Sequence, residues 1–313
     1  MRRTVTILAV VLLLMLVIGA GVAGSAIGGG FLHPMRLPLS AESVATIDRM
    51  LSSSGARRED FDITAPDGIQ LRGWKVRPHD PNGDWVLLFH GVSDNRSGMS
   101  GYAEFLVRRG YSLVMMDARA HGASAGAMAT FGWLERRDTA AVVQALYASE
   151  KVHCLFALGE SMGASIALQS AAIEPRIAAV VAESAFRNLR EVCYDYAGLR
   201  RFPLLGKTLF RPAVITALRA AEKEGGFRAD DVSPEKAVAA RPFPVLLICG
   251  LLDHNIPPRH TLAIHKSATG VKSLWLVPGA GHCGGYGAAP QEFERRVSEL
   301  FGKIHEQKQL TGG

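Results

Sequence analysis

Residues 155–172 read LFALGESMGASIALQSAA, and this stretch decides the fold. The apolar residues 155–158 predict a buried strand, and the small and apolar residues 162–173 predict a helix. Between them, GESMG at 159–163 matches the G-x-S-x-G pattern, in which a serine occupies a strained turn between a strand and a helix. With 33 glycines in 313 residues the bare pattern is weak evidence, but the flanking strand and helix make it specific. Ser161 is therefore predicted to be a nucleophile at the carboxyl end of a strand.

The rest of the chain alternates between short apolar runs and longer amphipathic runs from about residue 40 onward. This alternation is typical of a mostly parallel sheet flanked by helices, an α/β fold. The turn signal Pro66-Asp67-Gly68 predicts an antiparallel hairpin of residues 61–64 and 70–76. The other six predicted strands are 85–89, 112–116, 155–158, 178–182, 245–249 and 273–277, and the predicted helices are 97–109, 134–148, 162–173, 258–268 and 291–305.

Two segments depart from this alternation. Residues 186–241 contain prolines, a glycine pair and several aromatic residues, so they are predicted to form a small helical cap insertion above the carboxyl edge of the sheet. The first residues of the chain carry an arginine pair, and residues 4–27 that follow contain no charge. Such a run, about 24 residues long, can cross the roughly 30 Å hydrocarbon core of a bilayer as a helix.

Residues 1–28 are accordingly predicted to be a transmembrane signal anchor. A cleaved signal peptide is the alternative, because the small residues 23–26 could form a cleavage site. In both cases the arginine pair stays in the cytoplasm and the catalytic domain lies outside it, either membrane-bound through a single pass or secreted. The predicted organisation continues with a linker at 29–39, an α/β-hydrolase domain at 40–307 that includes the cap, and a tail at 308–313.

Charge and cysteine content disfavour several other classes of protein. The net charge is +6, but the arginine pairs are scattered along the chain, which disfavours nucleic-acid binding. No Cys or His pair has zinc-ligand spacing, so no metal or other cofactor is expected. Cys154 and Cys249 belong to predicted strands with one strand between them, too far apart for a disulfide. Cys193 and Cys283 could pair, but four free thiols are the default expectation.

A serine hydroxyl is a poor nucleophile at neutral pH unless a histidine, oriented by a carboxylate, accepts its proton. In folds with this serine turn, the acid and then the histidine follow the serine along the chain. Asp253 follows predicted strand 245–249 and His282 follows predicted strand 273–277, so both are expected at the carboxyl edge. The predicted catalytic residues are therefore Ser161, Asp253 and His282. His254 is the alternative base, but its side chain should point away because it adjoins the acid.

The tetrahedral intermediate of such a reaction needs two backbone N–H donors aimed at its oxyanion. Met162, the residue after the nucleophile, is expected to supply one of them. The other is expected from the loop His90-Gly91-Val92, through the amide of Val92. His90 itself is expected to brace this loop rather than to carry protons.

Together these motifs resemble the α/β-hydrolase superfamily, and more narrowly its serine aminopeptidase-like branch and the membrane-anchored α/β-hydrolase domain proteins. The resemblance covers roughly residues 61–305 and implies an eight-stranded, mostly parallel sheet. In the family motif D-x-R-G-H-G a glycine stands where this chain has Ala120, a departure expected to loosen a turn. Asp117, Arg119 and His121 of this motif are expected to brace the turn. The motifs are HGV at 90–92, DARAHGAS at 117–124, GESMG at 159–163, DVSPEKA at 231–237, GLLD at 250–253 and GH at 281–282.

The leading functional hypothesis is a serine hydrolase that cleaves a small lipid-like or medium-chain acyl ester, or a thioester, through an acyl-enzyme on Ser161. The alternative is a serine aminopeptidase-like peptidase, which would need Glu160, Glu183 or Asp195 to bind an ammonium group. A non-enzymatic scaffold is disfavoured by the intact triad. The apolar residues of the insertion either pack it onto the sheet or line an acyl pocket. They are Phe186, Tyr194, Tyr196, Leu199, Phe202, Leu204, Leu205, Leu209, Phe210, Val214 and Ile215.

Overall fold

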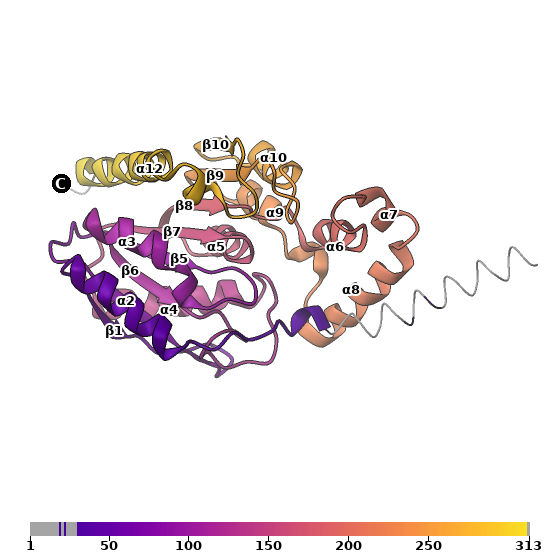
Figure 1. Ribbon diagram of the computed structural model, residues 1–313, viewed down its shortest axis with the longest axis horizontal. Helices are drawn as coiled ribbons and strands as arrows, with labels where there is room; N and C mark the ends of the chain where they lie inside the picture. Colours follow the sequence, from indigo (N-terminus) through magenta and orange to yellow (C-terminus); the bar gives the residue numbers. More distant parts are fainter. Residues whose placement is uncertain (1–18, 20–21, 23–29, 312–313) are drawn as a thin grey trace, which may run out of the picture.

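An eight-stranded sheet forms the centre of the molecule, with helices on both of its faces (Figure 1). The computed structural model describes residues 19, 22 and 30–311. Across the sheet the strand order is β1-β4-β6-β5-β7-β8-β9-β10, and β4 alone runs antiparallel to its neighbours. The strands are β1 Arg57–Asp60, β4 Gly73–Arg77, β5 Trp85–Phe89, β6 Ser112–Met116, β7 Leu155–Glu160, β8 Ile177–Glu183, β9 Val245–Gly250 and β10 Lys272–Val277. The predicted eight-stranded, mostly parallel sheet is confirmed.

Both faces of the sheet are covered, which explains why its central strands are apolar without alternation. Helices α2 (Ala41–Ser53), α3 (Ser100–Arg108) and α12 (Pro290–Thr311) cover one face, where Phe105, Phe156 and Phe301 are fully buried. The opposite face packs against α4 (Glu135–Ser149), α5 (Met162–Ile173), α9 (Pro234–Ala240) and α10 (Arg259–Ser267). The short helices η2 (Arg96–Met99) and α11 (Gly285–Ala288) complete the list of core elements.

The start of the sheet differs from the prediction. The turn at Pro66-Asp67-Gly68 does close an antiparallel pair, but its strands β2 (Ile63–Thr64) and β3 (Gln70–Leu71) form a separate two-stranded ribbon. The edge strand of the main sheet is instead β1, with the sequence Arg-Arg-Glu-Asp. An edge strand pairs on one side only and can be polar throughout. The apolar pattern used for prediction is therefore absent from β1.

The insertion between β8 and β9 lies beyond the carboxyl edge of the sheet, on the right of Figure 1. Its helices α6, α7 and α8 pack on one another, whereas α9 packs on α5 and belongs to the helical layer of the core. The cap helices enclose a small apolar core of their own, which also receives Leu32 from η1 (Gly30–Leu32). The bounds within the insertion are α6 Leu189–Ala197, α7 Pro203–Lys207, α8 Arg211–Gly225 and η3 Ala229–Asp231.

The two ends of the chain also bear on the predicted organisation. The predicted anchor at residues 1–28 lies outside the described residues, apart from positions 19 and 22. In the described part of the chain, no helix combines the length and the apolar character needed to span a bilayer. Leu32, which lies within the predicted linker at 29–39, is fully buried in the cap core. At the other end, helix α12 continues through residue 311, six residues past the predicted end at 305.

Candidate active site

Ser161 stands at the sharp turn between β7 and α5. Its backbone has φ 52° and ψ −118°, a conformation that a non-glycine residue adopts only under constraint from its surroundings. Its N–H donates to the carbonyl of Glu183 on β8 (2.8 Å), which fixes the turn to the neighbouring strand. A Cβ at Gly163 would lie 2.1 Å from the carbonyl oxygen of Phe89, so only glycine lets α5 pack against the end of β5. The G-x-S-x-G pattern thus has a steric basis in this chain.

The structure brings Ser161, His282 and Asp253 together at the carboxyl edge. Ser161 Oγ lies 2.9 Å from His282 Nε2, and His282 Nδ1 lies 2.9 Å from Asp253 Oδ2. The other carboxylate oxygen of Asp253 accepts the N–H groups of Asn255 (2.9 Å) and Ile256 (2.8 Å). Burial alone would raise the pKa of Asp253, but the hydrogen bonds from His282 and the Ile256 amide outweigh it and hold the pKa below its usual range. Asp253 is therefore a fixed, ionised partner for the imidazole.

The two proposed oxyanion donors belong to segments that flank the serine. Met162 is the first residue of α5, where a helix leaves its N–H groups without partners inside the helix. Val92 follows Gly91, and a Cβ built on Gly91 would lie 3.8 Å from Ser161 Cβ. The loop after β5 and the start of α5 therefore both lie next to Ser161.

The other candidate histidines are placed differently. His90 is buried, and its ring lies between two backbone groups: Nδ1 donates to the Gly91 carbonyl (2.7 Å) and Nε2 accepts the Ala118 N–H (3.0 Å). Burial lowers the pKa of His90, so the ring is neutral and ties the loop after β5 to the loop after β6. His254 is exposed to solvent, although it adjoins Asp253 in sequence.

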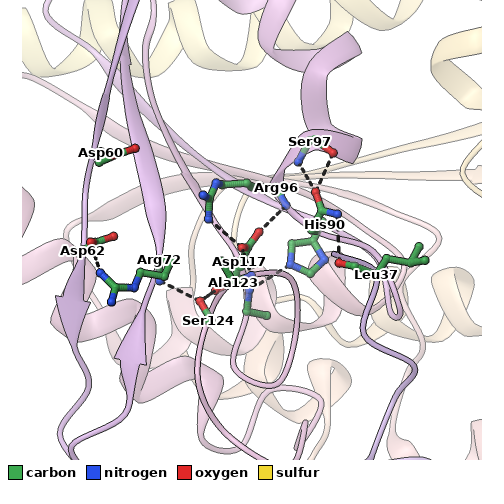
Figure 2. Close-up of polar contacts among 12 residues, drawn as sticks. Leu37, Asp60, Asp62, Arg72, His90, Arg96, Ser97, Asp117, Ala123 and Ser124 are labelled. Atoms are coloured by element: carbon green, nitrogen blue, oxygen red, sulfur yellow. Dashed lines mark hydrogen bonds and ion pairs between the residues drawn. The ribbon is translucent and has the colours of Figure 1, made fainter. Parts of the chain in front are cut away.

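The loop after β6 is held by the carboxylate of Asp117, which is completely buried (Figure 2). This carboxylate accepts the backbone N–H of Arg96, the Arg96 guanidinium and the N–H of Ala123, each at 2.7 Å. The hydroxyl of Ser124 donates to the Asp117 carbonyl (2.7 Å) and accepts the Arg72 N–H (2.8 Å). These contacts fit the expected bracing role of Asp117.

Ala120 lies in the same loop, at the position where the related motif has glycine. Its φ is +60°, in the left-handed region, and its N–H donates to the Ala125 carbonyl at 3.0 Å. An L-residue in this region costs roughly 1–2 kcal/mol relative to glycine. The turn is closed by this hydrogen bond, and alanine adds backbone strain there; that alanine loosens the turn relative to glycine stays a prediction.

A pair of acidic residues adjoins the triad, and no motif pointed to their joint role. The hydroxyl of Tyr102 lies 3.2 Å from Glu160 Oε2 and 3.0 Å from Glu183 Oε2, and the Gly285 N–H donates to Glu183 (2.6 Å). Burial, followed by the charge of Glu183, raises the pKa of Glu160 to about 7. One hydroxyl proton cannot serve both carboxylates. A proton on Glu160 that is donated to Tyr102, whose own proton then goes to Glu183, satisfies all three groups.

This pair gives a test through the pH dependence of stability. Because the pKa of Glu160 is higher in the folded than in the unfolded chain, its contribution to stability is present below about pH 4.5 and is lost as the pH rises through about 7. The Glu160→Gln variant lacks this loss. We therefore expect the free energy of unfolding of Glu160→Gln, relative to that of the wild type, to increase by about 2–3 kcal/mol between pH 4.5 and pH 8. Urea denaturation of both proteins at a series of pH values measures this difference. The exposed Glu306→Gln change should give no such trend, and parallel curves for wild type and Glu160→Gln would contradict the shared proton.

The three acids considered for an ammonium site have different surroundings. Asp195 is buried and bonded to His260 Nε2 (2.6 Å), with Arg259 as a second partner. Glu183 is buried as well, which leaves Glu160 as the partly exposed one.

The four cysteines, which include Cys193 and Cys283, are free in the structure.

Comparison with known proteins agrees with this architecture. Residues 80–231 match the family described as serine aminopeptidase, S33. The uncharacterised protein YqkD of Bacillus subtilis is 27% identical over 250 residues, which cover 79% of this chain and 80% of YqkD. The uncharacterised protein Rv2307c of Mycobacterium tuberculosis is 27% identical over 238 residues, 71% of this chain and 72% of its own.

Solved structures extend the likeness over the whole domain. The Pyrococcus furiosus esterase Pf2001 superposes with a TM-score of 0.68 at 23% identity, covering 87% of this chain and 99% of its own. A Thermogutta terrifontis esterase superposes with a TM-score of 0.57 at 20% identity, and the match covers 79% of this chain and 99% of the esterase chain. Sheet order, the serine turn and these likenesses agree that the chain has the α/β-hydrolase fold.

Proposed function

We propose that this protein is a serine ester hydrolase that acts through Ser161, His282 and Asp253. The observation that carries the proposal is the continuous chain of 2.9 Å contacts from the Ser161 hydroxyl through His282 to Asp253. Support for an ester as the scissile bond comes from the fold neighbours of Pyrococcus furiosus and Thermogutta terrifontis, both of which are named esterases.

In the proposed reaction His282 accepts the hydroxyl proton while Ser161 Oγ attacks the acyl carbon, and Asp253 stabilises the imidazolium that forms. The amides of Met162 and Val92 donate to the oxyanion of the tetrahedral intermediate. His282 then returns the proton to the leaving alcohol, and an acyl-enzyme remains on the serine. A water molecule, deprotonated by the same histidine, hydrolyses this acyl-enzyme and releases the acid.

The loops that carry these groups expose apolar side chains. Val92 on the loop after β5 is 43% exposed, and Leu251 and Leu252, directly before Asp253, are 47% and 55% exposed. The turn after α6 reaches the same region, because Arg200 in that turn bonds the side chain of Asn255, two residues after the acid. Apolar groups beside a polar reaction centre favour an acyl chain over a charged substrate.

The acyl-chain proposal predicts a dependence of rate on chain length. For p-nitrophenyl esters we expect kcat/KM to rise from acetate to octanoate, because each buried CH₂ contributes up to about 0.8 kcal/mol of binding. A Leu252→Asp variant should lose most of this rise while keeping its acetate rate. The exposed Leu262→Asp change on α10 is the matched control.

Two outcomes of this assay would count against the ester proposal. A flat or falling kcat/KM from acetate to octanoate would contradict an acyl site. Faster hydrolysis of aminoacyl amides than of any ester would assign the protein to the peptidases, with Glu160 as the first candidate to bind the substrate ammonium group.

We also propose that residues 1–28 hold the protein at a membrane, with the catalytic domain on the extracytoplasmic side. The cap offers indirect support. Residues 196–221 contain five basic residues and no acidic one, and several apolar side chains there are exposed. An apolar surface flanked by cations suits the interface of an anionic bilayer. The exposed residues are Tyr196, Leu199, Phe202, Leu204, Leu205, Leu209 and Phe210.

Fractionation of cells tests this localisation. The intact protein should stay with membranes in high salt and be released by detergent, because a spanning segment is held by apolar burial rather than by charge. A reporter fused after Gly313 should behave as extracytoplasmic. A chain that lacks residues 1–28 is the control and should be released by salt. Recovery of a shorter soluble form that begins near Ala26 would instead favour a cleaved signal peptide, and release of the intact chain by salt alone would contradict both.

A further inference from the structure

Four side chains with metal-binding atoms meet at the amino edge of the sheet. In the part of the chain that the structure describes, Asp84, His153, Cys154 and His305 each offer one ligand atom, and these atoms lie within 4.8 Å of one another. Asp84 bonds Nδ1 of His153 through one oxygen (3.0 Å) and Nδ1 of His305 through the other (2.8 Å). The sulfur of Cys154 lies 3.5 Å from His153 Nδ1.

The fold places these residues together although they are far apart in sequence. Asp84 directly precedes β5 and Cys154 directly precedes β7, and these strands are paired with Trp85 opposite Leu155. The Cys154 N–H donates to Asp84 at 3.0 Å, so the backbone fixes the two residues relative to each other. His305 comes from α12, which crosses this edge, and its ring centroid is 4.5 Å from that of His153.

We propose that Asp84, His153, Cys154 and His305 form a binding site for Zn²⁺. A carboxylate, two imidazoles and a thiolate are the ligand types of tetrahedral zinc sites, and sulfur with nitrogen selects zinc over Mg²⁺ or Ca²⁺. Bonds of about 2.0–2.3 Å place tetrahedral ligands roughly 3.3–3.8 Å apart, within the span of the four atoms here. Small side-chain rotations therefore convert the hydrogen-bonded cluster into a coordinated one.

The protons and charges of this site balance on binding. The ion replaces the thiol proton of Cys154, which passes to solvent, and the thiolate and the Asp84 carboxylate together neutralise the two charges of Zn²⁺. His153 and His305 both coordinate through Nδ1, the atom that each now bonds to Asp84, so the proton of each neutral ring moves to its Nε2. The Nε2 of His153, which is partly exposed, can donate to solvent. The Nε2 of His305 lies 2.7 Å from the side-chain amide of Gln309, and a 180° rotation of that amide would place its oxygen where it can accept the His305 proton.

The position of the site assigns it a structural role. Ser161 follows the carboxyl end of β7, whereas Cys154 precedes its amino end, about 20 Å away by the rise of the strand. Asp84 and Cys154 are buried, while His153 and His305 are partly exposed and leave a path for the ion. A bound ion would clamp helix α12 to the edge of the sheet without touching the reaction centre.

Metal titration of the full chain, purified without a polyhistidine tag and freed of metal by a chelator, tests the site. We expect one Zn²⁺ per chain with a Kd below about 1 µM and a Tm that rises by at least about 4 °C at saturation. With Co²⁺ as the probe, a sulfur-to-cobalt charge-transfer band should report the Cys154 thiolate. Mg²⁺ should produce neither effect.

Matched variants locate the ion. His305→Ala, at the surface of α12, should weaken Zn²⁺ binding at least 100-fold, and Cys154→Ser should abolish the charge-transfer band while ester hydrolysis remains. The exposed His79→Ala change should leave binding intact. The absence of Zn²⁺ binding to the wild type below about 100 µM, or unchanged binding by His305→Ala, would overturn the proposal, since the cluster would then be a hydrogen-bonded network alone.

Discussion

Replacing Ser161 with alanine should reduce kcat for ester hydrolysis by at least about 10⁴-fold, because no acyl-enzyme can form without the hydroxyl. The remaining rate would come from substrate binding and from the amides of Met162 and Val92. The fold should persist, since the surroundings that hold φ at 52° are unchanged and alanine is smaller than serine. Steady-state kinetics with p-nitrophenyl butyrate and labelling with a fluorophosphonate measure the two losses.

A second serine variant controls for effects of mutation in general. Ser298 lies on α12, and its buried hydroxyl has no hydrogen-bond partner among the described residues, so it bonds to no member of the triad. Ser298→Ala should therefore keep both the hydrolysis rate and the fluorophosphonate label. If Ser161→Ala still took up the label, the nucleophile would be another residue and the triad proposal would fail.

The sequence predicts those parts of the fold in which local pattern and tertiary role agree. Helix α5 has the predicted bounds, and the predicted strands of the parallel region appear within a few residues, because strands buried on both faces are continuously apolar. Strand order located Asp253 and His282, since each follows a parallel strand and the carboxyl ends of parallel strands share the edge that carries the serine. Strand β9 before Asp253 is buried, whereas β10 before His282 is an edge strand and only partly buried. Their distances to the serine come from the structure alone.

Other features leave no local pattern. Strand β1 is polar because its edge position needs no apolar face. Tyr102, Glu160 and Glu183 come from three elements and meet only when α3 packs beside β7 and β8. The glycine of the related motif hints at an unusual backbone conformation at Ala120. The positive φ of Ala120, and the strain that follows from it, are seen only in the structure.

Two histidines adjoin Asp253, His282 through a hydrogen bond and His254 in the sequence, and we expect different results when each is replaced. His282→Ala should reduce kcat/KM by at least about 10⁴-fold, because it removes the group that accepts the serine proton. His254→Ala should change kcat/KM by less than about threefold, since that ring is exposed and Ser161 contacts His282 instead. Both variants keep the hydrogen bonds from the Asn255 and Ile256 amides to Asp253.

The Asp253→Asn variant keeps His282 but changes the group that orients it, so it tests the role of the acid separately from that of the base. The neutral amide of asparagine cannot stabilise the imidazolium. Its NH₂ group would donate to Nδ1 and so favour the imidazole tautomer with the proton on Nε2, and Nε2 could then no longer accept the proton of Ser161. We therefore expect a loss on the order of 10³–10⁴-fold in kcat, with the unfolding temperature and the KM little changed. The carboxylate is held ionised by His282 and the Ile256 amide, so the effect should be the same across the neutral pH range. If His254→Ala proved as damaging as His282→Ala, or if Asp253→Asn kept most of the activity, the chain of contacts behind Ser161 would not be the catalytic one.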